Sequence, residues 1–239
     1  MRLTVWTFPV VLLCSCGGKR LEQVSAPKSP SDSTRPAELF QNITDQSGVR
    51  FVHRAATNYF MPDQIGSGIA VFDFDQDGRL DLYFVQNALP LAARNVLYHQ
   101  EQDGSFKDVS AGSGLDLSAR GMGAFAADVN NDGLPDLAVT EYGATRLFQN
   151  KGHGEFQEVT AEAGLDNPRW AVPASFLDFD RDGWLDLVVG NYVDYDPTQT
   201  CHDAQGRQEF CAPAAFPPTT ARLWRNVTRI QGATPRFED

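Results

Sequence analysis

The sequence predicts an all-β protein built from repeated four-stranded units, and three observations support this prediction. Twenty glycines and fourteen prolines in 239 residues indicate many turns and short strands. One pattern, in which two short apolar runs flank an acidic loop, occurs as GSGIAVFDFDQDGRLDLYFV, GMGAFAADVNNDGLPDLAVT and VPASFLDFDRDGWLDLVVG. The loops begin at Asp73, Asp128 and Asp178, so the unit recurs about every 50 residues, a period typical of propeller blades.

Each unit predicts four strands. The first two are apolar runs such as Ile69–Phe72 and Leu82–Val85, which are too short for helices. The other two lie in a second motif, which reads NVLYHQEQDGSFKDVSAGSGL, then TRLFQNKGHGEFQEVTAEAGL, and begins a third time as ARLWRN. Its Asp103-Gly104 and His153-Gly154 pairs are typical of hairpin turns. We therefore expect a partial β-propeller of about three to four four-stranded antiparallel blades, near residues 66–115, 121–165 and 172–239; a β-solenoid usually has shorter repeats.

The start of the repeat region resembles the end of a unit. Phe40–Val49 matches Phe106–Leu115 and Phe156–Leu165, so we expect residues 40–49 to form a ring-closing strand. The blade that this strand would complete is missing from the sequence. Residues 39–239 are therefore predicted to be an incomplete propeller, a fragment of a seven-bladed ring whose remaining blades belong to a longer chain.

The N-terminal segment predicts export. The apolar run Leu3–Leu13 is too short to span a bilayer of roughly 30 Å, so residues 1–15 are predicted to be a signal peptide. Leu13-Cys14-Ser15-Cys16 resembles a bacterial lipobox, which implies lipidation of Cys16; an ordinary secretory signal is the alternative. Residues 16–38 are polar and are predicted to be a disordered tether. We expect an exported chain, lipid-anchored at the cell envelope or secreted, with no membrane contact except the anchor.

The acidic loops predict metal sites because each fits D-x-[DN]-x-D-G-x-x-D. Side-chain oxygens at positions 1, 3, 5 and 9, with the carbonyl of position 7, can surround one cation, and the glycine at position 6 permits the turn. The all-oxygen set favours about three Ca²⁺ ions, ahead of Mg²⁺ or Mn²⁺, and the amide at position 3 of the second loop predicts a weaker site there. An EF-hand is excluded because position 12 holds no glutamate. The predicted ligands are Asp73, Asp75, Asp77, Arg79 and Asp81; Asp128, Asn130, Asp132, Leu134 and Asp136; Asp178, Asp180, Asp182, Trp184 and Asp186.

These loops and their flanking strands resemble FG-GAP/VCBS repeats, which form calcium-bearing blades in integrin-type β-propellers. The segments IGSGIAVFDFDQDGRLDLYFVQN, FQEVTAEAGL and NYVDYDPTQTCHDAQGRQEFCAPAAFPPTTARLWRN are similar to secreted proteins of the cartilage acidic protein group. Bacterial members of that group commonly carry a C-terminal UnbV/ASPIC domain, which this sequence lacks. The resemblance covers roughly residues 39–239 and implies a calcium-binding propeller.

The remaining features favour a binding module over an enzyme. The net charge of −11 argues against a nucleic-acid partner. No motif of a hydrolase, metalloprotease or phosphate loop is present, and His99 and His153 are expected to be ordinary surface residues. In an exported protein Cys201 and Cys211 predict a disulfide, with two free thiols as the alternative. We expect a calcium-binding module that recognises or adheres to a protein or carbohydrate ligand at the cell surface; the alternatives are the non-catalytic part of a surface hydrolase or other enzyme and a structural envelope protein.

Overall fold

The computed structural model describes residues 40–54, 58–87 and 93–239. Residues 43–239 form one compact unit, and residues 40–42 belong to a separate part of the chain. The predicted signal peptide, Cys16 and tether lie outside the described residues. Among the helices that the structure describes, none has the length and apolar composition needed to cross a membrane.

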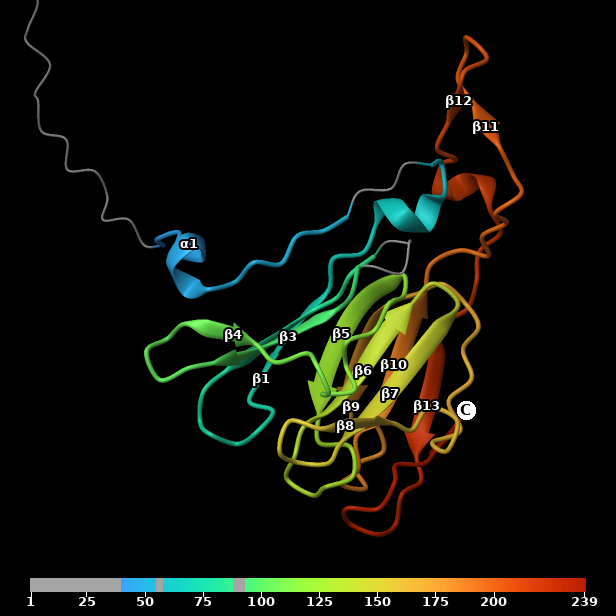
Figure 1. Ribbon diagram of the computed structural model, residues 1–239. Coiled ribbons are helices and arrows are strands. Elements are labelled where there is room, and N and C mark those ends of the chain that lie inside the picture. The colour runs from blue at the N-terminus through green and yellow to red at the C-terminus, as the bar shows by residue number, and fades with distance from the viewer. Residues whose placement is uncertain (1–39, 55–57, 88–92) are drawn as a thin grey trace, which may run out of the picture. The chain divides into compact units, whose positions relative to one another are not determined.

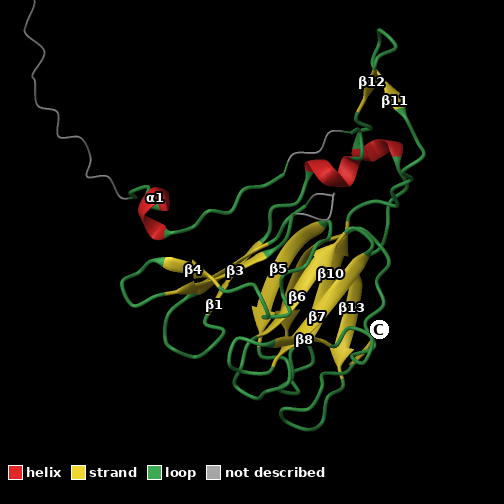
Figure 2. Ribbon diagram, in the orientation of Figure 1, coloured by secondary structure: helices red, strands yellow, loops and turns green. Residues whose placement is uncertain are grey.

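Three four-stranded antiparallel sheets make up most of the compact unit (Figures 1 and 2). Within each sheet the strands pair in chain order. The first sheet holds β1 (Ile69–Phe72), β2 (Asp81–Phe84), β3 (Val96–Gln100) and β4 (Phe106–Asp108). The second holds β5 (Gly121–Ala127), β6 (Asp136–Glu141), β7 (Ala144–Asn150) and β8 (Phe156–Glu158). The third holds β9 (Ala171–Leu177), β10 (Asp186–Asn191), β13 (Arg222–Asn226) and β14 (Phe237–Glu238).

The predicted all-β, blade-like architecture is confirmed, with one sheet for each repeat. The sheets lie face to face in chain order, and their first strands β1, β5 and β9 are neighbours. Alternate residues of each strand therefore point to opposite neighbours. Apolar side chains fill both spaces between sheets: the first space contains Phe72, Tyr83, Leu137 and Phe148, and the second contains Val129, Leu147, Leu187 and Trp224.

The third sheet has one apolar face that no described residue covers. Leu97 and Leu147 occupy the same position in the first two sheets and are fully buried, whereas their counterpart Leu223 is 42% exposed. Phe179 is 45% exposed for the same reason, because its counterparts Phe74 and Val129 lie under a following sheet. The face has the composition of a buried surface and not of a solvated one.

The free face of the first sheet is partly covered by the segment that precedes it. Phe51 stacks on Phe84 with ring centroids 4.9 Å apart, and the Arg50 amide donates to Tyr98 Oη at 3.1 Å. Among the described residues, 40–43 form no strand and Thr44–Ser47 is a short helix, α1, so the ring-closing strand stays a prediction for a chain that supplies its partner blade. A strand needs a paired neighbour, and the third strand of a preceding unit is not among the described residues.

The end of this segment nevertheless sits like its counterparts in the other repeats. Gly48, Gly114 and Gly164 all have φ near +80°, and each lies against the first carbonyl of the next fourth strand, with no room for a side chain. The C-terminal half of residues 40–49 therefore occupies the same structural position as the matching residues in the other repeats.

A group of short elements within the same compact unit covers one end of the sheets. It contains the two-stranded hairpin β11 (Cys201–His202) and β12 (Gln208–Glu209) and the 3₁₀ helices Met61–Gln64 and Pro213–Ala215. A disulfide joins Cys201 to Cys211. The hairpin lies at the opposite end of the second sheet from the end of β5 (Figure 1), and beneath it pack the aromatic rings of Trp170, Tyr195 and Phe216.

Candidate metal centre

The acidic loops connect the first two strands of each sheet, and their first aspartate shapes the turn. Asp73 accepts the amides of Asp77 and Gly78 at 3.1 and 2.8 Å. Asp128 and Asp178 accept the equivalent pairs of amides at 2.8–3.1 Å. The glycine at position 6 has φ between +83° and +92° in all three loops, a conformation that other residues rarely adopt. The three loops therefore share one backbone conformation.

The ninth position of each loop holds a completely buried carboxylate. Asp81, Asp136 and Asp186 have no exposed surface, and each accepts two backbone amides at 2.7–3.3 Å. Burial raises the pKa of Asp81, and it raises the pKa of Asp136 to about 7. Each of these buried carboxylates is hydrogen-bonded only by neutral backbone amides, so a cation in the loop would stabilise its charge.

The first and third loops bring three carboxylates together. One oxygen from each of Asp73, Asp75 and Asp81 lies within 4.8 Å of the others, and Asp178, Asp180 and Asp186 form the same group. Three convergent carboxylates with no sulfur ligand fit a hard divalent cation such as Ca²⁺.

The second loop differs because of its amide. Asn130 donates its Nδ2 to Asp132 Oδ2 at 2.9 Å, so two of the predicted ligands are bonded to each other. Asp128 and Asp136 remain available as carboxylate donors. An ion in the second loop would have to break this hydrogen bond, which is a physical reason to expect a weaker site there.

The fifth and seventh positions of the loops are joined locally. Asp77, Asp132 and Asp182 each accept the amide of the residue two positions later, at 2.8–3.0 Å. The residues that donate these amides are Arg79, Leu134 and Trp184, whose carbonyls are the predicted seventh ligands. The turn thus holds positions 5 and 7 of each loop beside each other.

Sequence reasoning missed the residue that the third strand presents to each loop. His99, Gln149 and Arg225 occupy this position in β3, β7 and β13. The expectation that His99 is an ordinary surface residue is wrong: its side chain is only 16% exposed, and Nε2 lies 3.2 Å from Asp75 Oδ2 and 2.9 Å from Asp77 Oδ2. In the third loop Arg225 forms an ion pair with Asp180 at 2.7 Å.

The environment of His99 is strongly anionic. Burial alone would lower the pKa of His99, but the carboxylates of Asp77, Asp81 and Asp75 outweigh burial and raise it. The sequence places His99 directly after Tyr98 in the strand that pairs with β2. That position indicates contact with the acidic loop only when the register between the two strands is known.

Hydrogen bonds link the first and second loops to the blade that follows each of them. Asn150 of β7 donates to the Phe74 carbonyl in the first loop, and Asn226 of β13 donates to the Val129 carbonyl in the second, both at 2.8 Å. At the loop surface, Gln76 donates to the Gly133 carbonyl at 2.5 Å and Asn131 donates to the Gly183 carbonyl at 3.0 Å. The loops therefore form a connected row along one edge of the sheets.

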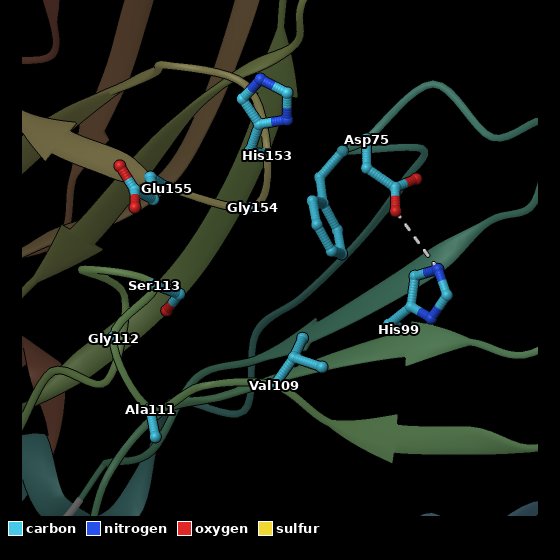
Figure 3. Close-up of a pocket in the computed structure, with 10 residues that line it drawn as sticks. Asp75, His99, Val109, Ala111, Gly112, Ser113, His153, Gly154 and Glu155 are labelled. Carbon is cyan, nitrogen blue, oxygen red and sulfur yellow. Dashed lines mark ion pairs between the residues drawn. The ribbon is translucent and has the colours of Figure 1, made fainter.

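A cleft of about 770 Å³ opens beside the first loop (Figure 3). Asp75 and His99 lie on one side, and His153 and Glu155 of the second repeat lie on the other. The apolar side chains of Phe74 and Val109 line it between them. A ligand in this cleft would approach the first loop directly.

Comparison with known proteins agrees with this architecture. A family model described as an FG-GAP-like repeat matches residues 73–139 and 128–189. Cartilage acidic protein 1 from Homo sapiens is 28% identical over 109 residues, which cover 44% of this chain and 16% of that protein. The same protein from Mus musculus and Xenopus tropicalis is also 28% identical over 109 residues, or 17% of each. The chain thus aligns with about a sixth of these relatives.

Proposed function

We propose that this chain, which carries FG-GAP-like repeats over residues 73–189, is a calcium-stabilised recognition module that binds a protein or carbohydrate ligand. FG-GAP repeats are associated with ligand or adhesion recognition by β-propellers. Loops at both ends of a rigid set of blades can vary without disturbing the core, which suits recognition. The match covers only 16–17% of the length of the relatives, so the ligand proposed for this chain is not taken from theirs.

The observation that carries the calcium proposal is the buried carboxylate at the ninth position of every loop. An ion at each loop would neutralise this charge and engage the first, third and fifth side chains together with the carbonyl of the seventh residue. Extracellular modules of this type bind calcium with Kd around 10⁻⁴ to 10⁻³ M. At 100 times Kd, each occupied site stabilises the folded state by about 2.7 kcal/mol.

Calcium titration of the full chain tests this proposal. Equilibrium dialysis should give close to three bound ions, and melting curves should move to higher temperature in CaCl₂ than in EDTA. Asp75→Asn and Asp180→Asn should each remove about one equivalent. Asp103→Asn is the control, because Asp103 lies in the β3–β4 hairpin, where its carboxylate bonds to Ser105. Identical melting curves in calcium and chelator would refute the proposal.

We propose that the protein is exported and anchored through Cys16, on the support of the apolar run at residues 3–13 and the following Leu-x-Ser-Cys sequence. Globomycin treatment or Cys16→Ser should block lipid attachment and release the chain from membranes. A mature N-terminus at another residue, or unchanged membrane attachment of the Cys16→Ser chain, would contradict this proposal.

We further propose a non-catalytic role and additional blades in a longer chain. The carboxylates near the cleft belong to the first loop and its neighbouring turn, so they need no acid–base role to account for them. The exposed apolar face with Leu223 and Phe179 supports a following blade. A protein containing further repeats should bury this face and protect Leu223 from hydroxyl-radical labelling; equal labelling in the short and long chains would contradict it.

A further inference from the structure

The three loops differ most in the side chain that the third strand presents to them. We propose that His99 makes the first loop a nitrogen-and-oxygen site selective for a first-row transition ion such as Zn²⁺, while the second and third loops remain all-oxygen sites. The inference rests on the proposed function in one respect, namely that the loop holds a divalent ion at all: in calcium alone its oxygens would take Ca²⁺, and a transition ion would replace that Ca²⁺ because of His99.

The donors in the first loop converge from two separate elements. Asp75 and Asp77 come from the β1–β2 loop, and His99 comes from β3. One ligand atom from each of the three lies within 4.8 Å of the others. Imidazole with carboxylates is a ligand set that zinc and related ions prefer, whereas calcium takes oxygen only.

The His99 imidazole contacts other side chains on the side away from Asp75 and Asp77. Its ring packs edge-on against Phe74, with centroids 5.9 Å apart, and Nδ1 lies 3.7 Å from Glu101 Oε1. At this distance Glu101 makes no hydrogen bond to the ring, but its negative charge favours a metal-bound imidazole electrostatically. Nε2 points toward Asp75 and Asp77 while Nδ1 faces a second acidic group.

The other two loops lack such a donor. Gln149 accepts Lys151 Nζ at 2.6 Å, and a neutral amide is a weak ligand for zinc. Arg225 cannot bind a metal at all, and its guanidinium already pairs with Asp180. The residue at this position of the third strand therefore gives the three loops different metal-binding groups and different charges.

One contact opposes a metal in the first loop. Arg79 pairs with Asp77 Oδ2, and its Nε donates to the Gln100 carbonyl at 2.7 Å. A bound ion would have to displace this guanidinium from the carboxylate. The competing interpretation is that Arg79 and a protonated His99 neutralise the loop themselves, with no nitrogen-bound metal, and the experiment below separates the two.

The experiment uses the full chain without a polyhistidine tag, in buffer containing 10 mM CaCl₂. Zn²⁺ binding is measured by calorimetry and Co²⁺ binding by its visible absorption spectrum. We expect one tight Zn²⁺ site whose affinity falls at least about tenfold in His99→Gln, which gives the first loop the residue found in the second. Gln149→His should add a second Zn²⁺ site, and His153→Gln, which removes an exposed imidazole across the cleft, should change nothing.

The outcomes separate this inference from the calcium proposal. Zn²⁺ affinity that is equal in wild type and His99→Gln, with a normal rise of melting temperature in calcium, would overturn the inference alone. A His99-dependent Zn²⁺ site in a protein that calcium does not stabilise would support the inference and overturn the calcium assignment. Melting curves in EDTA check that each variant is folded.

Discussion

Replacing Asn150 with alanine should weaken the contact between the first two blades and so lower the free energy of unfolding. Asn150 is buried, and its Nδ2 donates to the carbonyls of Phe74 and Pro135 at 2.8 and 3.2 Å. Its Oδ1 accepts the amide of Gly152 at 2.9 Å. The substitution leaves three backbone groups without their partner, at about 1 kcal/mol each, so we expect a loss of about 3 kcal/mol in the free energy of unfolding.

The chain offers both a replicate and a control for this prediction. Asn226 makes the same three contacts at the next interface, with the Val129 and Leu185 carbonyls and the Thr228 amide, so Asn226→Ala should lose a similar amount. Gln100 occupies this position in the first sheet, and its side chain makes no hydrogen bond with the residues that the structure describes. We therefore expect Gln100→Ala to change stability by less than about 0.5 kcal/mol.

Urea unfolding followed by tryptophan fluorescence measures all three variants, and thermal melts should show a decrease of roughly 6–12 °C for the two asparagine variants. Losses below about 1 kcal/mol in both Asn150→Ala and Asn226→Ala would refute the reasoning that these side chains hold neighbouring blades together. A loss in Gln100→Ala equal to theirs would show that the position matters within its own sheet and not between blades.

Three further predictions follow from the fold. Replacing Cys201 and Cys211 by serine should lower the free energy of unfolding by roughly 2–3 kcal/mol, because the disulfide closes a loop of about ten residues in the unfolded chain, and urea titration with and without reductant measures it. In calcium-free protein, burial raises the pKa of Asp136 to about 7, so protonated Asp136 contributes its full stability below about pH 4 and this contribution is lost as the pH rises toward 7. The melting temperature of the wild type, measured relative to that of Asp136→Asn, should therefore fall between about pH 4 and pH 7, and added calcium should reverse the fall. Leu147→Ala should cost about 3 kcal/mol but Leu223→Ala less than about 1 kcal/mol, because only the first is covered by a following sheet; equal losses in urea would contradict the assigned faces.

The local features of the repeat were predictable from the sequence because they depend on neighbouring residues. The apolar runs became the first two strands of each sheet, and the aspartates and glycines of the loops adopted one common turn. Short-range chemistry also identified the hairpin at Asp103-Gly104, which joins β3 to β4.

Features that depend on distant partners were not predictable in this way. Phe40–Val49 has the sequence of a fourth strand, but the described residues 40–43 form no strand, because the strand that would pair with them is not among the residues that the structure describes. The roles of His99 and Arg225 depend on the register between the second and third strands, which places one residue of the third strand opposite the loop. Local patterns in a single sequence do not specify that register, and so these two side chains, which contact the loop aspartates from the third strand, went unrecognised.

The bonds from Gln76 to Gly133 and from Asn131 to Gly183 give the row of loops a direction. Each earlier loop donates to the later one, and each loop contacts only its immediate neighbours through them. An ion that orders one loop would reduce the conformational entropy left for the adjacent loop to lose, so occupation of one site would favour occupation of the next. Binding along the row would then be positively cooperative between neighbours and weaken with each blade of separation, as in a one-dimensional chain.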